Sequence, residues 1–269
     1  MYRKQDKMKV LFIGDIFGKP GLKTVVQELP KLKEKYKIDF VIVQGENISG
    51  RKGLIQKDYK KLKDAGVNAF TMGNHVWAKD DIKNILKYND VIRPYNVSKN
   101  YAGKGSIVFD VKGEKLRVTS MMGITFNELR KPWKESHASN FFDALDEIKD
   151  QKTDEDYHFI DFHGETTSEK AVFSLYADGL VDAIVGTHTH VQTSDDKILP
   201  NGTAFITDVG MTGPKNAAIG ADFESVYLKM RYDEMSRFTV SKNDCQVNAV
   251  VIELNKKGNK IQRLNYEIK

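Results

Sequence analysis

Short apolar segments that end in glycine and polar residues alternate with helical stretches along the first third of this chain. The apolar segments are KVLFIGD at 9–15, DFVIVQGEN at 39–47 and NAFTMGNH at 68–75. Stretches at about 22–36 and 56–65 have the pattern of helices and separate these segments. Strands that alternate with helices form βαβ units, because a parallel strand is reached by crossing back over the sheet. The order therefore predicts an α/β fold built on a parallel sheet.

The rest of the chain continues with a different mixture of elements. Two β-rich runs at 106–123 flank Lys112-Gly113, which indicates a hairpin. The further predicted elements are a helix near 141–149, a strand at 157–165, a helix near 168–177, a strand at 180–190, and two strands around a turn at 257–259. Antiparallel strands should therefore dominate late in the chain. Because no linker, repeat or low-complexity segment interrupts the order, we expect residues 1–269 to form a single domain.

Composition and charge limit the classes of function. Hydrophobic residues make up 40% and charged residues 29% of the chain, which is typical of a globular protein without membrane spans. The net charge is +5, but 34 of the 42 basic residues are lysines and they are scattered. This pattern favours a solvated surface over a nucleic-acid surface built on arginine. We expect no membrane partner and no dedicated nucleic-acid surface.

Two features indicate a cytoplasmic location. The apolar run that follows the basic start MYRKQDK ends at Gly14, too soon for a signal peptide. Cys245 is the only cysteine, so neither an intramolecular disulfide nor a thiolate metal site can form. Any metal must be bound by nitrogen and oxygen ligands. Sheet edges and the late hairpins would be covered in a homo-oligomer, which leaves self-association open.

Polar side chains gather at the ends of the predicted strands. In open α/β sheets the carboxyl ends of the strands meet at one edge, and ligands bind there. The residues at those ends are Asp15, Glu46, Asn47, Asn74, His75, His163, His188 and His190. Four of the six histidines of the chain are among them. We therefore expect these eight residues to form one site.

The residue types indicate a transition-metal site. Carboxylate, carboxamide and imidazole ligands without thiolate suit manganese, iron or zinc and contain too much nitrogen for calcium or magnesium alone. Eight ligands are too many for one tetrahedral ion and match two ions that share a carboxylate. Two ions about 3.5–4 Å apart are suited to in-line displacement at phosphorus. The pattern predicts phosphoryl chemistry.

The five strand ends together resemble the motifs of a known family. GD at 14–15, GEN at 45–47, GNH at 73–75, DFHGE at 161–165 and GTHTH at 186–190 are similar to the five motifs of calcineurin-like metallophosphoesterases. The resemblance implies an α/β fold that is a sandwich of two mixed β-sheets flanked by helices.

Two further segments narrow the resemblance. DFHGETTSEK at 161–170 and DVGMTGP at 208–214 are similar to the YmdB-like bacterial branch, whose members hydrolyse phosphodiesters such as 2′,3′-cyclic nucleotides. Phe17 stands where the wider superfamily has a histidine, and Glu46 stands where it has a bridging aspartate. The YmdB-like branch shares both changes.

The resemblance also implies a role for each residue of the site. One set of ligands holds the first metal: Asp15, Asn47 and His190. A second set holds the second metal: Asn74, His163 and His188. Glu46 would contact both ions. The ions would be iron or manganese in preference to zinc. A hydroxide between them would attack phosphorus in line. His75 is the catalytic residue, which hydrogen-bonds a phosphate oxygen or protonates the leaving alkoxide. No organic cofactor is expected.

Residues next to the predicted ligands have weaker assignments. On an extended strand Asp161 would point the same way as His163 and could orient a ligand imidazole, although capping of the next turn fits equally. Thr187 and Thr189 alternate with the histidines, so we expect them to face away and to have no chemical role.

Three other assignments complete the expectations. Thr167 or Ser168 should cap the helix that follows DFHGE. GMTGP at 210–214 should form a loop near the mouth of the site or a purely structural turn. His137 and His158 are expected to be ordinary core histidines.

Three functions are compatible with this site. The first is a dinuclear phosphodiesterase for small phosphodiesters such as 2′,3′-cyclic nucleotides. The second is a phosphomonoesterase that acts on nucleotides or phosphoproteins. The third is a regulatory protein that binds a ligand through its metals with little turnover.

Overall fold

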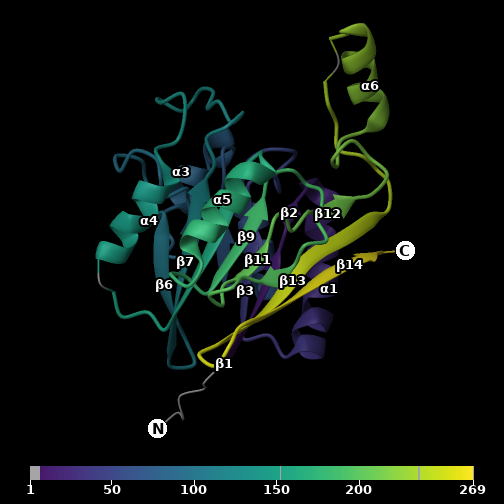
Figure 1. The fold of residues 1–269 in the computed structure, drawn as a ribbon. Coiled ribbons are helices and arrows are strands. Elements are labelled where there is room, and N and C mark those ends of the chain that lie inside the picture. The colour runs from purple at the N-terminus through teal and green to yellow at the C-terminus, as the bar shows by residue number, and fades with distance from the viewer. Residues whose placement is uncertain (1–6, 152, 236, 269) are drawn as a thin grey trace.

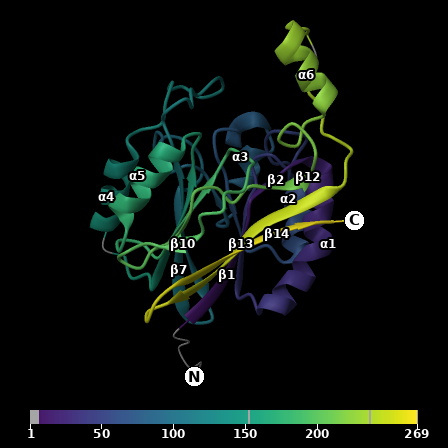
Figure 2. The same cartoon turned by 45° about the vertical axis from the view of Figure 1, so that its right-hand side comes forward.

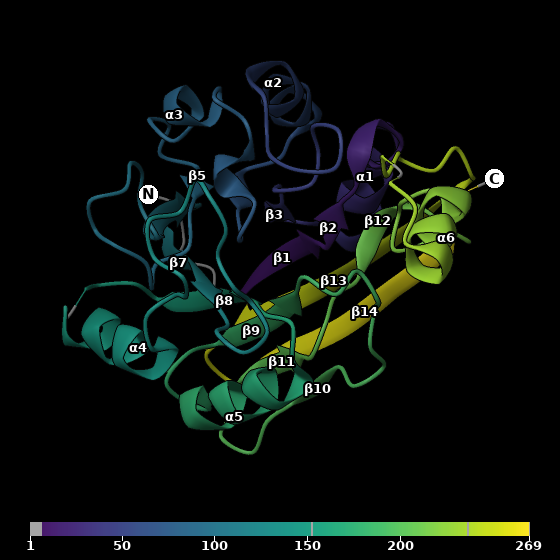
Figure 3. The same ribbon diagram turned by 90° about the horizontal axis from the view of Figure 1, so that it is seen from above.

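Two mixed β-sheets face each other and carry helices on their outer surfaces, as predicted (Figures 1 and 3). The computed structural model describes residues 7–151, 153–235 and 237–268. The first sheet contains β1 (Lys7–Ile13), β2 (Asp15–Ile16), β3 (Phe40–Gln44), β4 (Ala69–Thr71), β5 (Val91–Ile92), β12 (Met211–Pro214), β13 (Cys245–Asn255) and β14 (Lys260–Glu267). The second sheet contains β6 (Ser106–Val111), β7 (Glu114–Met122), β8 (Tyr157–His163), β9 (Ala183–Thr187), β10 (Lys197–Ile198) and β11 (Ala204–Ile206).

The four predicted helices occur in the predicted order, and three elements are added to them: a 3₁₀ turn at 76–78 and helices at 82–85 and 223–232. They are α1 (Gly18–Tyr36), α2 (Gln56–Ala65), a 3₁₀ turn (Val76–Ala78), α3 (Ile82–Ile85), α4 (Phe141–Asp150), α5 (Thr167–Ala177) and α6 (Phe223–Tyr232). Within the described ranges, no helix is long and apolar enough to span a membrane. The first six residues, which entered the prediction of no signal peptide, lie outside the described residues.

The first sheet joins the two ends of the chain. β1, β3, β4 and β5 are parallel neighbours, as the βαβ pattern predicts, and β13 pairs antiparallel with β1. In the second sheet β7, β8, β9 and β11 are parallel, whereas β6 and β10 pair antiparallel at the two edges. Parallel pairing therefore continues later in the chain than we expected. Both sheets place the carboxyl ends of their parallel strands around the same region (Figure 3).

The side chains of β1 explain why its sequence is apolar without interruption. Val10 and Phe12 face the second sheet, and the Phe12 ring stacks on Phe159 of β8 at 5.5 Å between centroids. Leu11 and Ile13 point the other way, into the cluster formed with α1 and α2. A strand covered on both faces needs apolar residues at every position. The core therefore has two layers, with a third between the second sheet and helices α4 and α5.

Two local predictions are wrong. Thr166, not Thr167 or Ser168, caps α5, because its Oγ1 accepts a hydrogen bond from the Glu169 backbone N–H at 3.3 Å. The segment at 210–214 is not a loop: β12 pairs with β2 and β13. Neither partner of β12 is near it in sequence, so local turn chemistry gave no signal of the pairing.

The two histidines expected in the core have different environments. His137 is exposed, and its Nδ1 lies 3.1 Å from Oγ of the neighbouring Ser136, so this prediction is wrong. His158 is buried, and its Nε2 lies 2.9 Å from Thr119 Oγ1, as expected for a core histidine. Burial, with a smaller effect of the Arg117 charge, lowers the pKa of His158 to about 3.

Burial of neutral His158 makes stability depend on pH. The unfolded chain binds a proton at this residue below a pH of about 6.5, whereas the folded chain binds it only near pH 3. The contribution of neutral His158 to stability is therefore fully present above a pH of about 6.5 and is lost as the pH falls below that value. We expect a slope of up to ~1.4 kcal/mol per pH unit from this residue. The free energy of unfolding, measured in urea, should differ less between pH 7.5 and pH 5.0 for His158→Gln than for wild type. His137→Gln is the control, and an unchanged difference in His158→Gln would contradict this assignment.

Candidate metal centre

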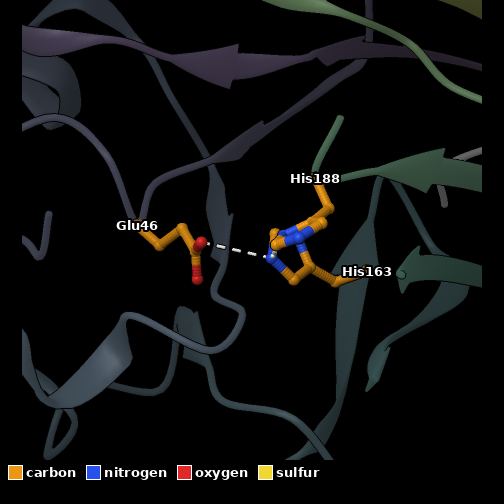
Figure 4. A group of neighbouring side chains, drawn as sticks. All are labelled: Glu46, His163 and His188. Carbon is orange, nitrogen blue, oxygen red and sulfur yellow. Dashed lines mark hydrogen bonds and ion pairs between the residues drawn. The ribbon is translucent and has the colours of Figure 1, made fainter. Parts of the chain in front are cut away.

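All eight predicted residues lie where the carboxyl ends of the strands meet. Asp15 follows β1, Glu46 and Asn47 follow β3, and Asn74 and His75 follow β4. His163 ends β8, and His188 and His190 follow β9. The two sheets contribute opposite sides of the site, so Glu46 faces His163 and His188 across it (Figure 4).

Four ligand atoms converge on one point beside His163. His163 Nε2 lies 2.9 Å from Asn74 Oδ1, 3.0 Å from His188 Nδ1 and 3.1 Å from Glu46 Oε1. A ring nitrogen carries at most one hydrogen, so it cannot satisfy three such neighbours by hydrogen bonding. Ligands bound at about 2.0–2.1 Å to one ion lie about 3 Å from each other. This set, which we call the His163 cluster, therefore fits a transition-metal ion.

A second set of ligands, the His190 cluster, is arranged around His190. The Asn47 carboxamide Nδ2 donates to Asp15 Oδ1 at 3.2 Å and lies 3.3 Å from His190 Nε2. His190 Nε2 is 3.6 Å from Asp15 Oδ1. Rotation of the carboxamide by 180° would present its oxygen, the atom that binds metals, to the same place. The chemistry and spacing of these residues also fit a cation.

The two clusters are coupled through backbone and carboxylate contacts. The His188 backbone N–H donates to Asp15 Oδ2 at 3.2 Å, which links β9 to the His190 cluster. Glu46 Oε1 faces His163, while Glu46 Oε2 accepts the His75 backbone N–H at 2.9 Å. This bond fixes the orientation of the carboxylate. Its predicted contact with both metals stays a prediction.

The electrostatics of the clusters favour positive charge. Burial raises the pKa of Glu46, but the adjacent His163 charge and hydrogen bond outweigh it, and the resulting pKa is far below the usual range. Burial opposes the charged form of His163 as well, yet Glu46 raises its pKa to about 9. Burial and the His163 charge lower the pKa of His188 to about 3. Glu46 is thus a buried carboxylate whose charge is balanced by a cation, and a metal ion can take the place of the imidazolium proton.

Thr187 contacts the site, contrary to our expectation. Its Oγ1 lies 2.9 Å from His163 Nδ1 and donates to Asp161 Oδ1 at 2.7 Å. β8 and β9 pair in parallel with His163 opposite Thr187, so the two side chains share one face of the sheet. Asp161 therefore orients the imidazole through Thr187, and His163 presents Nε2 to its cluster.

Thr189 also has a structural role that alternation did not predict. His188 and His190 have φ values of 100° and 66°, in the left-handed region that residues other than glycine rarely adopt. The strand has ended at Thr187, so period-2 alternation no longer applies. Asp208 Oδ2 holds the turn by accepting from Thr189 Oγ1 at 2.8 Å and from the Thr189 backbone N–H at 3.2 Å.

Several residues near the site were not found from the sequence. Gln44 Nε2 lies 3.3 Å from His163 Nδ1, and Glu165 Oε2 lies 2.9 Å from His188 Nε2, opposite the ring nitrogen that faces the His163 cluster. Lys170 is buried and donates to Asp208 Oδ2 at 2.7 Å. Gly73 is required because a Cβ there would lie 2.2 Å from the His163 ring. Of these residues, only Glu165 had a recognisable signal, since it follows His163 in DFHGE, although the histidine that it contacts is His188.

The position of Thr187 predicts a measurable effect on metal binding. Thr187→Val keeps the shape of the side chain but removes the hydroxyl that orients His163, so affinity for manganese or zinc should fall about 10–100-fold. Calorimetric titration of the metal-free protein measures the change. Thr119→Val is the matched control, because Thr119 also contacts a buried histidine, but outside the site. Equal affinities of Thr187→Val and wild type would contradict the proposed orientation.

The fold and the two clusters together define the class of the protein. A sandwich of two mixed sheets with these motifs at its strand ends is a calcineurin-like metallophosphoesterase fold. A solved NAD nucleotidase from Haemophilus influenzae shares the fold, with a TM-score of 0.59 at 15% identity over 97% of this chain and 56% of that chain. Within this class, the chain belongs to the YmdB-like protein family, whose model matches residues 11–266.

Relatives match the chain over nearly its whole length. It is 42% identical over 262 residues to a 2′,3′-cyclic-nucleotide 2′-phosphodiesterase of Bacillus subtilis, which covers 96% of each chain. Among solved structures it is similar to a novel phosphatase from Mycoplasma pneumoniae, with a TM-score of 0.90 and 39% identity over 97% of this chain and 94% of that chain. A hypothetical protein from Thermus thermophilus gives a TM-score of 0.89 and 34% identity over 97% of this chain and 100% of that chain.

Proposed function

We propose that this protein is a phosphodiesterase that uses two transition-metal ions to hydrolyse small phosphodiesters such as 2′,3′-cyclic nucleotides. The observation that carries the proposal is the convergence of Asn74, His188 and Glu46 on His163 Nε2 within 3.1 Å. The name of the Bacillus subtilis relative supports the substrate class. We further propose that residues 1–269 act as one domain in the cytoplasm, where Cys245 would stay reduced.

The residues divide into two ligand sets. Asn74, His163 and His188 would hold one ion, and Asp15, Asn47 and His190 the other, with Glu46 between them. Iron or manganese fits this mixture of ligands best, and zinc is compatible. When bound, the ions supply Lewis acidity toward the phosphoryl group.

His75 is the residue best placed for proton transfer. Its side chain lines the cavities beside the clusters, and its backbone N–H is fixed by Glu46 Oε2. Within the described residues, the His75 imidazole makes no hydrogen bond to either cluster, so the ring is left to donate to a phosphate oxygen or to the leaving alkoxide. An alkoxide is a poor leaving group, so protonation in the transition state lowers the barrier. Lys52 lines the same cavities and would balance the charge of the substrate.

The test is hydrolysis by the purified protein. With added manganese or iron, bis-p-nitrophenyl phosphate and 2′,3′-cyclic AMP should be cleaved faster than p-nitrophenyl phosphate, and a chelator should stop the reaction. His75→Ala should lower kcat about 10²–10⁴-fold, whereas His137→Ala, the exposed control, should not. Faster cleavage of the monoester would indicate a phosphomonoesterase. No cleavage of any diester with any of these metals would favour the regulatory protein.

A further inference from the structure

Two cavities meet at the clusters. The larger, of about 700 Å³, lies against α6 and is called here the α6 cavity. The smaller, of about 340 Å³, lies against the loop at 126–133 and is called the 126–133 cavity. Lys52, His75 and His188 line both, so the cavities join beside the catalytic groups. A phosphate at the clusters would therefore have an open cavity on each of two sides.

The walls of the α6 cavity are apolar and aromatic. Phe223 and Tyr227 stack at 5.4 Å between centroids on α6, which extends away from the sheets (Figures 1 and 2). Phe17 packs edge-to-face on His190 at 5.4 Å, so the aromatic wall begins directly beside the His190 cluster. The Arg51 guanidinium lies 5.6 Å from the Phe238 ring centroid. Flat aromatic and guanidinium surfaces of this kind stack on nucleobases.

The 126–133 cavity begins beside the His163 cluster, and its charge differs from that of the α6 cavity. Trp133 Nε1 donates to the Asn74 backbone oxygen at 2.8 Å, which joins this wall to a residue of the His163 cluster. Phe126, 88% exposed, provides a second aromatic surface. Arg130 and Lys131 also line the cavity. Aromatic and cationic groups together suit a nucleoside.

A cyclic nucleotide cannot use both cavities. In a 2′,3′-cyclic nucleotide the phosphate bridges two oxygens of one ribose, so a single base extends from the reacting centre. That base would fill the larger, aromatic α6 cavity and would leave the 126–133 cavity without a ligand. A linear dinucleotide has one nucleoside on each side of its phosphate, which matches the two cavities.

We propose that the substrates of this site include linear dinucleotides, with one nucleoside in the α6 cavity and the other in the 126–133 cavity. This inference rests on the proposed function. In the reaction one water is consumed: its oxygen becomes bonded to phosphorus, and the ester bond to the leaving nucleoside breaks. The leaving oxygen takes up a proton. The products are a nucleoside monophosphate and a nucleoside with a free hydroxyl group.

The experiment compares a linear and a cyclic substrate on the same metal-loaded enzyme. The substrates are adenylyl-(3′→5′)-adenosine and 2′,3′-cyclic AMP, and the variants are Phe126→Ala and Arg130→Ala. Loss of one stacking surface should lower kcat/KM for the dinucleotide about tenfold more than for the cyclic nucleotide. Leu175→Ala, at a similarly exposed apolar residue on α5 outside both cavities, is the control and should not change the ratio.

The outcomes separate this proposal from the function on which it rests. Cleavage of cyclic AMP without cleavage of the dinucleotide would overturn the two-sided site and leave the phosphodiesterase proposal standing. Equal losses on both substrates in Phe126→Ala and Arg130→Ala would also overturn it. Failure to cleave either substrate or bis-p-nitrophenyl phosphate would overturn the proposed function and this inference together. Melting temperatures of the variants should match wild type, because both residues lie at the surface.

Discussion

Replacement of Glu46 by glutamine is expected to lower kcat/KM for phosphodiesters ~10³-fold or more and to reduce the metal content. The Glu46 carboxylate is buried, and its two oxygens face His163 Nε2 and the His75 N–H. Glutamine keeps the size of the side chain but removes the charge, and its amide group would place hydrogens against one of these donors. Steady-state kinetics with bis-p-nitrophenyl phosphate and elemental analysis of the same sample measure both effects.

Glu165→Gln is the matched control for this substitution. Glu165 also contacts a histidine of the site, at 2.9 Å from His188 Nε2, but its side chain is 49% exposed and lies outside the clusters. We expect it to orient His188 rather than bind metal, so its loss should cost no more than about 10–100-fold. If Glu46→Gln retained its metals and its activity, Glu46 would have no part in the reaction.

The edge of the parallel sheet was predictable because its signals are local. GD, GEN and GNH each place glycine and a ligand directly after an apolar run, and the run itself marks the strand. Residues from distant parts of the chain then meet because parallel strands end at one edge. Periodicity alone did not predict a second sheet. That prediction came from the family resemblance.

The residues that were missed depend on contacts between distant segments. Lys170 belongs to a helix in which lysine would usually be exposed, and only the fold brings it to Asp208. Alternation placed Thr187 away from the site, whereas its contact with His163 depends on the pairing of β8 with β9. Helix α6 was not predicted, although Phe223, Val226, Tyr227 and Met230 have helical spacing. These residues line the α6 cavity rather than the core, and Val226 is the only buried residue of the helix.

Lys170→Met is expected to lower the free energy of unfolding by about 3–5 kcal/mol. Lys170 and Asp208 are both 1% exposed and are joined by a 2.7 Å bond. Methionine fills a similar volume but leaves the Asp208 carboxylate buried without its cation, which costs far more than loss of a surface pair. Urea unfolding followed by circular dichroism measures the change. Lys149→Met is the control, because this lysine is exposed and its replacement should cost within about 0.5 kcal/mol.

A second substitution separates loss of the pair from loss of lysine packing. If the unpaired charge is the cause, Asp208→Asn should restore part of the stability lost in Lys170→Met, because the buried carboxylate is gone from the double variant. Activity should not recover with it. Asp208 also holds Thr189 between His188 and His190, whose backbones are in the left-handed region, and an amide accepts fewer of these hydrogen bonds. Equal stabilities of Lys170→Met and wild type would show that the pair does not stabilise the fold.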